Sequence, residues 1–300
     1  MKRNRTILVS TILMVVMCLA ISTTSCGTSG KQEKSVTDVP AVQDAGSVIS
    51  SDSLVTLMLN DLSGIDDLEK YMGMYDRQTA AITSYWNQSH KGEDPSQMVK
   101  TVFGEFQLLA DSLAGSSTMD MVESGELECA MSRYQTASEY CGKYRDNPLY
   151  RDEMCDWIQL ENELNTFYCN LAQVAYWRGS IVNVIISGAM RNLAKKRLAD
   201  YLQLFKGGKF AEFPMPIAEA RANLIQEIND ARSLEVEDGS DEDLNNTFKA
   251  LNESGDRVVE LLDKWLVSRN KLCESLGVPE SHTAWLIDQF SSRIQEIIEN

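Results

Sequence analysis

Proline and histidine are scarce in this chain. Six prolines and two histidines occur among its 300 residues. A proline inside a helix removes a hydrogen bond and clashes with the preceding turn, so helices are free to run long where prolines are few. The prolines after residue 50 all fall where a helix would begin or end, at Pro95, Pro148, Pro214, Pro216 and Pro279.

Several familiar catalytic motifs are also missing. His90 and His282 belong to no Glu-x-x-His or His-Glu-x-x-His pattern, which argues against a di-iron bundle and against the common zinc peptidases. The chain has no Gly-x-Ser-x-Gly elbow and no phosphate-binding loop. Its many acidic residues are expected on solvent faces as ionised carboxylates. We therefore expect no catalytic residue, no metal and no cofactor, with an unrecognised hydrolase as the remaining alternative.

The first residues have the pattern of an export signal. Three basic residues within positions 1–5 precede an apolar stretch at 7–21, as in the charged start and short hydrophobic core of a secretory signal peptide. A membrane-spanning helix needs about 20 apolar residues, and polar residues at 22–25 end this stretch early. We predict a signal peptide over residues 1–25, with a spanning helix as the weaker alternative.

The next segment resembles the lipobox of bacterial lipoproteins, because small residues flank Cys26 in the run Thr24-Ser25-Cys26-Gly27. The resemblance implies cleavage before Cys26 and acylation of its sulfur and new amino group by fatty acids such as palmitate. Two or more acyl chains hold a protein on a bilayer almost permanently. Gly27 in place of Asp implies an outer membrane, on its periplasmic side or at the cell surface. The alternative is a plain secretory signal with an unmodified cysteine.

Composition changes after the predicted lipidation site. Residues 26–50 are rich in small and polar residues without a helical period, which predicts a flexible tether. Residues 51–300 are expected to form one acidic, all-helical domain.

Charge limits the partners of that domain. The formal net charge of the chain is −16, and loss of the three basic residues of the signal peptide would lower it by three, to −19. A field of this sign repels nucleic acid and anionic lipid and attracts basic proteins over about 8 Å at physiological salt. We therefore expect no nucleic acid partner. The alternative to a basic partner is that the charge only keeps the protein soluble.

Apolar spacing and capping residues predict an up-and-down bundle of about seven to eight helices. Ser63–Asp66 and Asp94–Gln97 have the sequences of helix starts. The acidic run 235–243 is expected to be a solvated connection. The predicted helices lie at about 68–87, 95–113, 118–146, 148–174, 181–207, 217–233, 244–276 and 280–298.

Heptad-like seams are most regular in three of these segments. Apolar residues repeat in steps of three and four over 127–144, 157–174 and 244–276, which places them on one buried face of each helix. The short polar turn at Asn147–Pro148 then predicts an antiparallel hairpin in which the first two seams face each other.

One charged residue, Arg269, lies on the third seam. Burial of an unpaired guanidinium costs too much free energy to be tolerated, so Arg269 needs a carboxylate. Glu161 and Glu163 are the candidate partners. The alternative is that Arg269 reaches water at the rim of the bundle.

Five cysteines remain in the predicted domain, and export to an oxidising compartment would permit disulfides. They are Cys129, Cys141, Cys155, Cys169 and Cys273. In a hairpin folded about Pro148, Cys141 lies level with Cys155, and Cys129 with Cys169, so two bridges are possible. Cys155 and Cys169 flank their seam, however, so the angular match is imperfect. With five cysteines one must be unpaired or bonded to another chain, and the absence of a Cys-x-x-Cys pair argues against zinc.

Two segments resemble the lysozyme inhibitor LprI-like family. The first is Trp157–Tyr168, which contains Leu164-Asn165 followed three residues later by Tyr168, and the second is Leu262–Cys273, which contains Trp265, Arg269 and Cys273 in that order. The resemblance covers about a third of the chain and implies a small exported helical module. It further implies that Trp265 packs against the helix of Leu164, that Arg269 forms a structural ion pair, and that Cys273 bridges an earlier cysteine.

These patterns lead to one functional hypothesis and one alternative. We expect a lipid-anchored envelope protein with a non-catalytic, helical protein-binding domain. The resemblance implies a lysozyme as its basic partner. The alternative is a structural envelope lipoprotein without a soluble ligand.

Overall fold

The structure, a computed structural model, describes residues 49–143, 145–177, 179–206, 213–234 and 241–299. Every regular element within these ranges is helical, which confirms the predicted all-α bundle. The predicted signal peptide and Cys26, and all but the last two residues of the predicted tether, lie outside the described residues.

The helices follow the predicted segments closely, with one addition at the start. Helix α2, which has only ten residues, was not predicted. The elements are α2 (Ser51–Asn60), α3 (Leu68–Ser89), the 3-10 turn η1 (Pro95–Gln97), α4 (Met98–Ala114), α5 (Thr118–Lys143), α6 (Pro148–Ala175), α7 (Val182–Lys206), α8 (Ile217–Arg232), α9 (Glu242–Leu276) and α10 (Glu280–Glu299).

Side-chain caps explain most of the helix starts. The Asn147 side chain accepts a hydrogen bond from the Leu149 amide at the start of α6, and Asp94 caps η1 in the same way. Ser117 and Asp120 cap each other at the start of α5, each side chain accepting from the other's amide. Gly277 ends α9 at a φ of 65°, a left-handed conformation that favours glycine.

The structure corrects two predictions, the helix start at Ser63–Asp66 and the acidic connection before α9. Asp67, not Ser63, caps α3, because its carboxylate accepts from the Lys70 amide while the Ser63 hydroxyl bonds back to Asn60. Residues 241–243 of the predicted acidic connection belong to the start of α9, and residues 235–240 of that run lie outside the described residues. Asp241 is the N-cap of α9, and the next two acids form its first turn, where negative charge favours the helix dipole.

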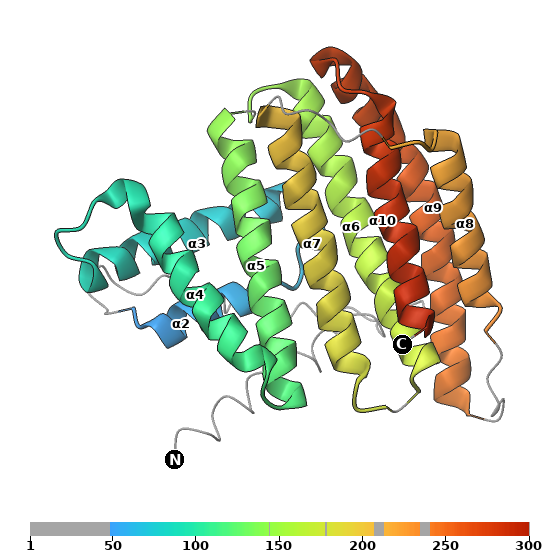
Figure 1. Cartoon of the computed structure of the whole chain (residues 1–300), viewed down its shortest axis with the longest axis horizontal. Coiled ribbons are helices and arrows are strands. Elements are labelled where there is room, and N and C mark those ends of the chain that lie inside the picture. Colours follow the sequence, from blue (N-terminus) through green and yellow to red (C-terminus); the bar gives the residue numbers. More distant parts are fainter. Residues whose placement is uncertain (1–48, 144, 178, 207–212, 235–240, 300) are drawn as a thin grey trace, which may run out of the picture.

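The helices form an elongated bundle with a smaller group packed on one side (Figure 1). Helices α5 to α10 run alternately up and down, and α2, α3 and α4 lie against the α5 side of the bundle. The main contacts between helices join α6 to α9, α5 to α7, and α8 to α10.

The predicted face-to-face hairpin of α5 and α6 is therefore wrong. Helix α5 packs instead along α7, and the two run parallel, since Gly125 approaches Ser187 and the Cys129 thiol donates to the Met190 carbonyl at 3.6 Å. Every residue from 124 to 134 is buried. A helix buried on all sides has several contact faces, so its heptad-like seam did not identify its principal neighbour.

An aromatic cluster lies where α6, α9 and α10 meet. The Trp157 ring packs edge-on against Trp265, with centroids 5.7 Å apart, and lies 6.0 Å from Phe290. All three side chains are almost fully buried. This cluster fixes the position of the charged residues that lie beside it.

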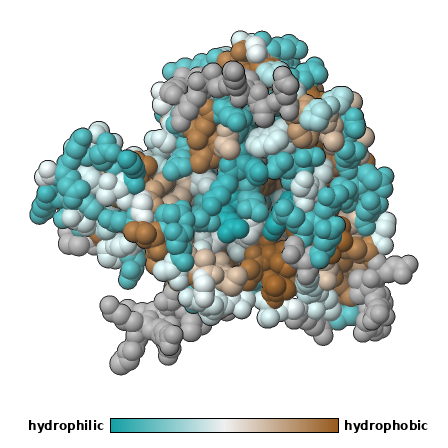
Figure 2. Space-filling model, viewed as in Figure 1, coloured by the Kyte–Doolittle hydropathy of each residue, from teal (hydrophilic) through white to brown (hydrophobic). Residues whose placement is uncertain are grey.

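Polar side chains cover most of the face shown in Figure 2, with smaller apolar patches between them. Among the described residues, no helix combines the length and the apolar character needed to cross a membrane.

Candidate functional site

A network of charged side chains lies inside the bundle and joins α6, α7, α9 and α10. Arg197 donates two hydrogen bonds to Glu153, at 2.9 and 2.6 Å, and a third to Asp200 at 2.8 Å. Arg269 donates to both oxygens of Asp200, and the His282 Nε2 atom lies 2.8 Å from one of them. Glu153, Asp200 and Arg269 are 0% exposed, and Arg197 and His282 are 2% exposed.

Aromatic rings hold the two arginines in place. The Arg197 guanidinium lies 4.3 Å from the ring centroids of both Trp157 and Tyr201. The Trp265 ring faces Arg269 at 5.6 Å, and its indole N–H donates to Glu153 at 2.8 Å. Stacking of this kind stabilises a desolvated cation, so the network and the aromatic cluster form one unit.

The network keeps the Asp200 carboxylate charged. Burial would raise the pKa of Asp200, but Arg269, the hydrogen bond from His282, and Arg197 outweigh it and hold that pKa well below its usual range. Burial would likewise lower the pKa of Arg197, but Glu153, Tyr201 and Asp200 together outweigh burial and raise that pKa. Two arginines therefore face two carboxylates, and their formal charges cancel.

A second buried pair lies on the other side of Trp157. Arg133 of α5 donates to Glu161 of α6 at 3.0 Å and to the Leu62 carbonyl at 3.0 Å. The second oxygen of Glu161 accepts from the Trp157 indole at 3.0 Å. This pair links α5 and α6 and anchors the loop after α2, although the two helices do not pack closely.

These contacts settle the predicted partner of Arg269. Arg269 is buried and ion-paired, but its partners are Asp200 and Glu153. Glu161 is occupied by Arg133, so the predicted pairs with Glu161 and Glu163 are wrong. The expectation that acids lie on solvent faces is also wrong for Glu153, Glu161 and Asp200, because burial between arginines satisfies them.

The residues that carried the family resemblance lie near this network. Trp157, Leu164 and Tyr168 are buried in α6, and Trp265 packs against that helix. The Tyr168 hydroxyl donates to the Phe290 carbonyl at 3.4 Å. Asn165 lies on the same helix but is only partly buried.

None of the five described cysteines is in a disulfide. Arg133 and Glu161 show that α5 and α6 do run antiparallel in about the predicted register. The thiols nevertheless point to different helices: Cys129 contacts Met190 of α7, and Cys141 contacts Met72 of α3. The predicted bridges Cys141–Cys155 and Cys129–Cys169 are therefore not formed.

The remaining thiols also have other neighbours. Gln173 donates to Cys169 within α6, and Cys273 lies 3.8 Å from the Thr283 hydroxyl, so Cys273 bridges no earlier cysteine. Burial raises the pKa of Cys129 to about 11, which disfavours the reactive thiolate.

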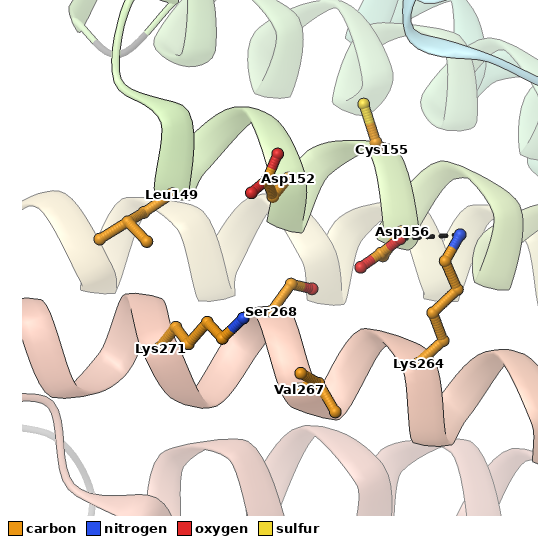
Figure 3. Close-up of a pocket in the computed structure, with 8 residues that line it drawn as sticks. All are labelled: Leu149, Asp152, Cys155, Asp156, Lys264, Val267, Ser268 and Lys271. Atoms are coloured by element: carbon orange, nitrogen blue, oxygen red, sulfur yellow. Dashed lines mark ion pairs between the residues drawn. The ribbon is translucent and has the colours of Figure 1, made fainter.

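A cleft of about 350 Å³ opens between the start of α6 and the end of α9 (Figure 3). Its α6 wall carries Asp152 and Asp156, and its α9 wall carries Lys264 and Lys271. The Lys264 ammonium pairs with Asp156 at 3.0 Å. Leu149, Cys155, Val267 and Ser268 complete the lining.

The two histidines occupy different environments. His282 is buried against Asp200 and stacks on Trp285. His90 stacks on Trp86 and lies 3.1 Å from both Glu93 and Glu105. One carboxylate thus contacts His282, which is closed to solvent, and two contact the partly buried His90. Among the described residues, no cluster of three or more acidic, histidine or cysteine side chains is arranged to hold a metal ion.

No protein family, curated protein or solved structure matches this chain.

Sequence reasoning missed Glu153, Arg197 and Asp200. The signal was present in α7, where Arg197, Asp200 and Tyr201 follow an apolar stretch and Leu204 continues it. Charged residues at steps of three and four within an apolar pattern indicate burial, as they did for Arg269. Because Lys195 and Lys196 precede Arg197, the segment resembled a solvated basic turn, and the burial of Arg197 was not predicted.

Replacement of Asp200 by Asn should lower the free energy of unfolding by about 3–5 kcal/mol, because it leaves two buried arginines short of a carboxylate. Urea unfolding followed by circular dichroism measures this change. The matched control is Asp263→Asn, which breaks the half-exposed pair of Asp263 with Arg221 at 2.6 Å and should cost less than about 1 kcal/mol. Equal losses in both variants would contradict a special role for the buried network.

Glu126 of α5 provides a test at a different site. It is buried, and burial followed by the nearby Glu123 carboxylate raises its pKa to about 7. A raised pKa means that the folded protein favours the neutral acid, so stability is lost as pH rises from about 4.5 through 7.

The Glu126→Gln variant should therefore unfold at a higher temperature than the native chain at pH 8, with a gain of about 2–3 kcal/mol in the free energy of unfolding. The two proteins should converge near pH 4.5, because both then carry a neutral side chain. Thermal unfolding across this pH range measures the difference. The exposed Glu274→Gln variant is the control and should follow the native chain throughout. A constant difference at every pH would show that Glu126 does not titrate in this way.

Proposed function

We propose that this chain is a lipid-anchored lipoprotein of a bacterial envelope, and that its non-catalytic helical domain binds a basic protein. The anchor is supported by the short apolar signal that ends at Cys26 between small residues. Two or more acyl chains at Cys26 would hold the domain at an outer membrane, on its periplasmic side or at the cell surface.

The observation that carries the binding proposal is the placement of charge. The three most buried arginines, Arg133, Arg197 and Arg269, are matched by Glu161, Glu153 and Asp200. These groups cancel one another and add nothing to the formal net charge of −16, and most of the other described acidic residues are exposed. A negative surface steers positively charged proteins toward it and raises their association rate.

The family resemblance supports a lysozyme as the basic partner. Trp265 lies against α6 and Arg269 forms a buried ion pair, as the resemblance implies. Cys273 departs from it, because its thiol is free. The alternative function, a structural lipoprotein without a soluble ligand, shares the anchor and differs only in the absence of a partner.

The anchor makes a direct prediction. Cells expressing the native chain should incorporate labelled palmitate into it and retain it in the membrane fraction, whereas Cys26→Ala should abolish both, because the acyl chains supply the membrane affinity. Cys18→Ala, a cysteine change within the apolar stretch of the predicted signal peptide, is the matched control and should behave as the native chain. Continued membrane retention of Cys26→Ala without palmitate would contradict the proposed anchor.

The binding proposal predicts a complex that depends on salt. A c-type lysozyme should bind the purified chain at micromolar concentration in about 20 mM salt and at least tenfold more weakly in about 300 mM salt, because salt screens surface charges. Calorimetry measures binding, and lysis of a cell-wall suspension measures inhibition. An acidic protein of similar size serves as the control ligand. If lysozyme neither binds nor is inhibited at low salt, the chain is not a lysozyme inhibitor, and the structural alternative stands.

A further inference from the structure

The cleft between α6 and α9 differs from the rest of the surface in its charge. The two helices run antiparallel, since Asp156 faces Lys264 and Asn170 contacts Ser254 farther along. Two carboxylates on one wall therefore oppose two ammonium groups on the other. In a chain with a net charge of −16, this cleft is electrically balanced.

Half of the charges in the cleft already have partners. Lys264 pairs with Asp156 at 3.0 Å and also donates to the Gln159 side chain at 2.8 Å. In the described part of the chain, no ion pair within 4.0 Å engages Asp152 or Lys271. Figure 3 shows the Lys271 side chain running along α9 toward Ser268, while Asp152 lies on the facing helix. The cleft thus offers one carboxylate and one ammonium at separate positions.

The lining of the cleft is partly apolar. Val267 is 58% exposed and, with Leu149, lines the cleft. The Ser268 hydroxyl donates to the Trp265 carbonyl at 3.0 Å, which leaves its oxygen lone pairs as acceptors. A volume of about 350 Å³ is at the small end of ligand pockets in proteins.

From this arrangement we propose that the cleft binds a small zwitterion, a molecule of amino-acid or dipeptide size that carries an ammonium group and a carboxylate. The ligand ammonium pairs with Asp152, the ligand carboxylate pairs with Lys271, and a short aliphatic part lies over Val267. Both ends then gain charge-assisted hydrogen bonds, the stronger class in proteins.

Other ligand classes fit the cleft less well. A metal ion would require more ligands than the two carboxylates, and Lys264 already neutralises one of these. A simple anion would use Lys271 but would face the Asp152 carboxylate. A basic protein attracted by the overall negative charge would gain nothing from Lys271, so the zwitterion site is separate from the proposed function.

The dipeptide L-alanyl-L-alanine is a suitable probe, together with its N-acetyl and its C-terminal amide forms, which each lack one charge. The purified full chain should bind the dipeptide with a dissociation constant below about 1 mM and should bind both modified forms at least tenfold more weakly. Asp152→Asn should remove the preference for the free ammonium, and Lys271→Gln the preference for the free carboxylate. Each should weaken dipeptide binding about tenfold, the expected effect of losing one charged hydrogen bond.

Matched controls separate the effect of changing the net charge from the effect of changing a residue in the cleft. Asp76→Asn on α3 and Lys100→Gln on α4 make the same chemical changes at exposed positions far from the cleft in sequence, and should bind the dipeptide as the native chain does. Cys155 lines the cleft, so bound dipeptide should slow its alkylation by iodoacetamide. The similarly part-buried Cys141, which faces α3, should react at an unchanged rate.

Three results would overturn the proposal. These are the absence of dipeptide binding at millimolar concentration, equal binding of the N-acetyl or amide form, and equal weakening by the control substitutions. None of them bears on lysozyme binding or on the anchor, so failure here is distinguishable from failure of the proposed function.

Discussion

The burial of Asp200 between two arginines and a histidine is the constraint on which the bundle depends. A carboxylate with no exposure to solvent is tolerated only where cations and hydrogen bonds compensate it, and here these come from α7, α9 and α10. Glu153 brings α6 into the same arrangement through Arg197 and Trp265. Four helices must therefore adopt one relative position for any of these charges to be satisfied.

Leucine seams alone would not impose that restriction. Apolar side chains tolerate sliding and exchange of neighbours with small changes in free energy, whereas the two-pronged contact of Arg197 with Glu153 fits one geometry. We infer that the network contributes to specificity of packing more than to net stability, because desolvation consumes much of the attraction between buried ions. The aromatic rings of Trp157 and Tyr201 support this role by restricting where the guanidinium can lie.

Local features of the sequence were sufficient to predict the helices but not their neighbours. Helix termini depend on nearby side chains or on local backbone geometry. The starts at Asp94 and Asn147 and the end at Gly277 could therefore be predicted from the local sequence. The burial of Arg269 also followed from its place on a seam. Its partner did not, because Asp200 lies 69 residues earlier in the chain and only the packing of α7 brings it close. Helix α5, buried on several sides, likewise gave no indication that α7 would be its parallel neighbour.

The network also sets a condition on how the protein acquires its structure. Its members run from residue 153 on α6 to residue 282 on α10, so the final helix supplies a contact that α7 needs. A chain without α10 leaves Asp200 without its contact to His282. The network is therefore complete only once α10 is in place, and removal of α10 should loosen the packing of α7 and α9 around Asp200.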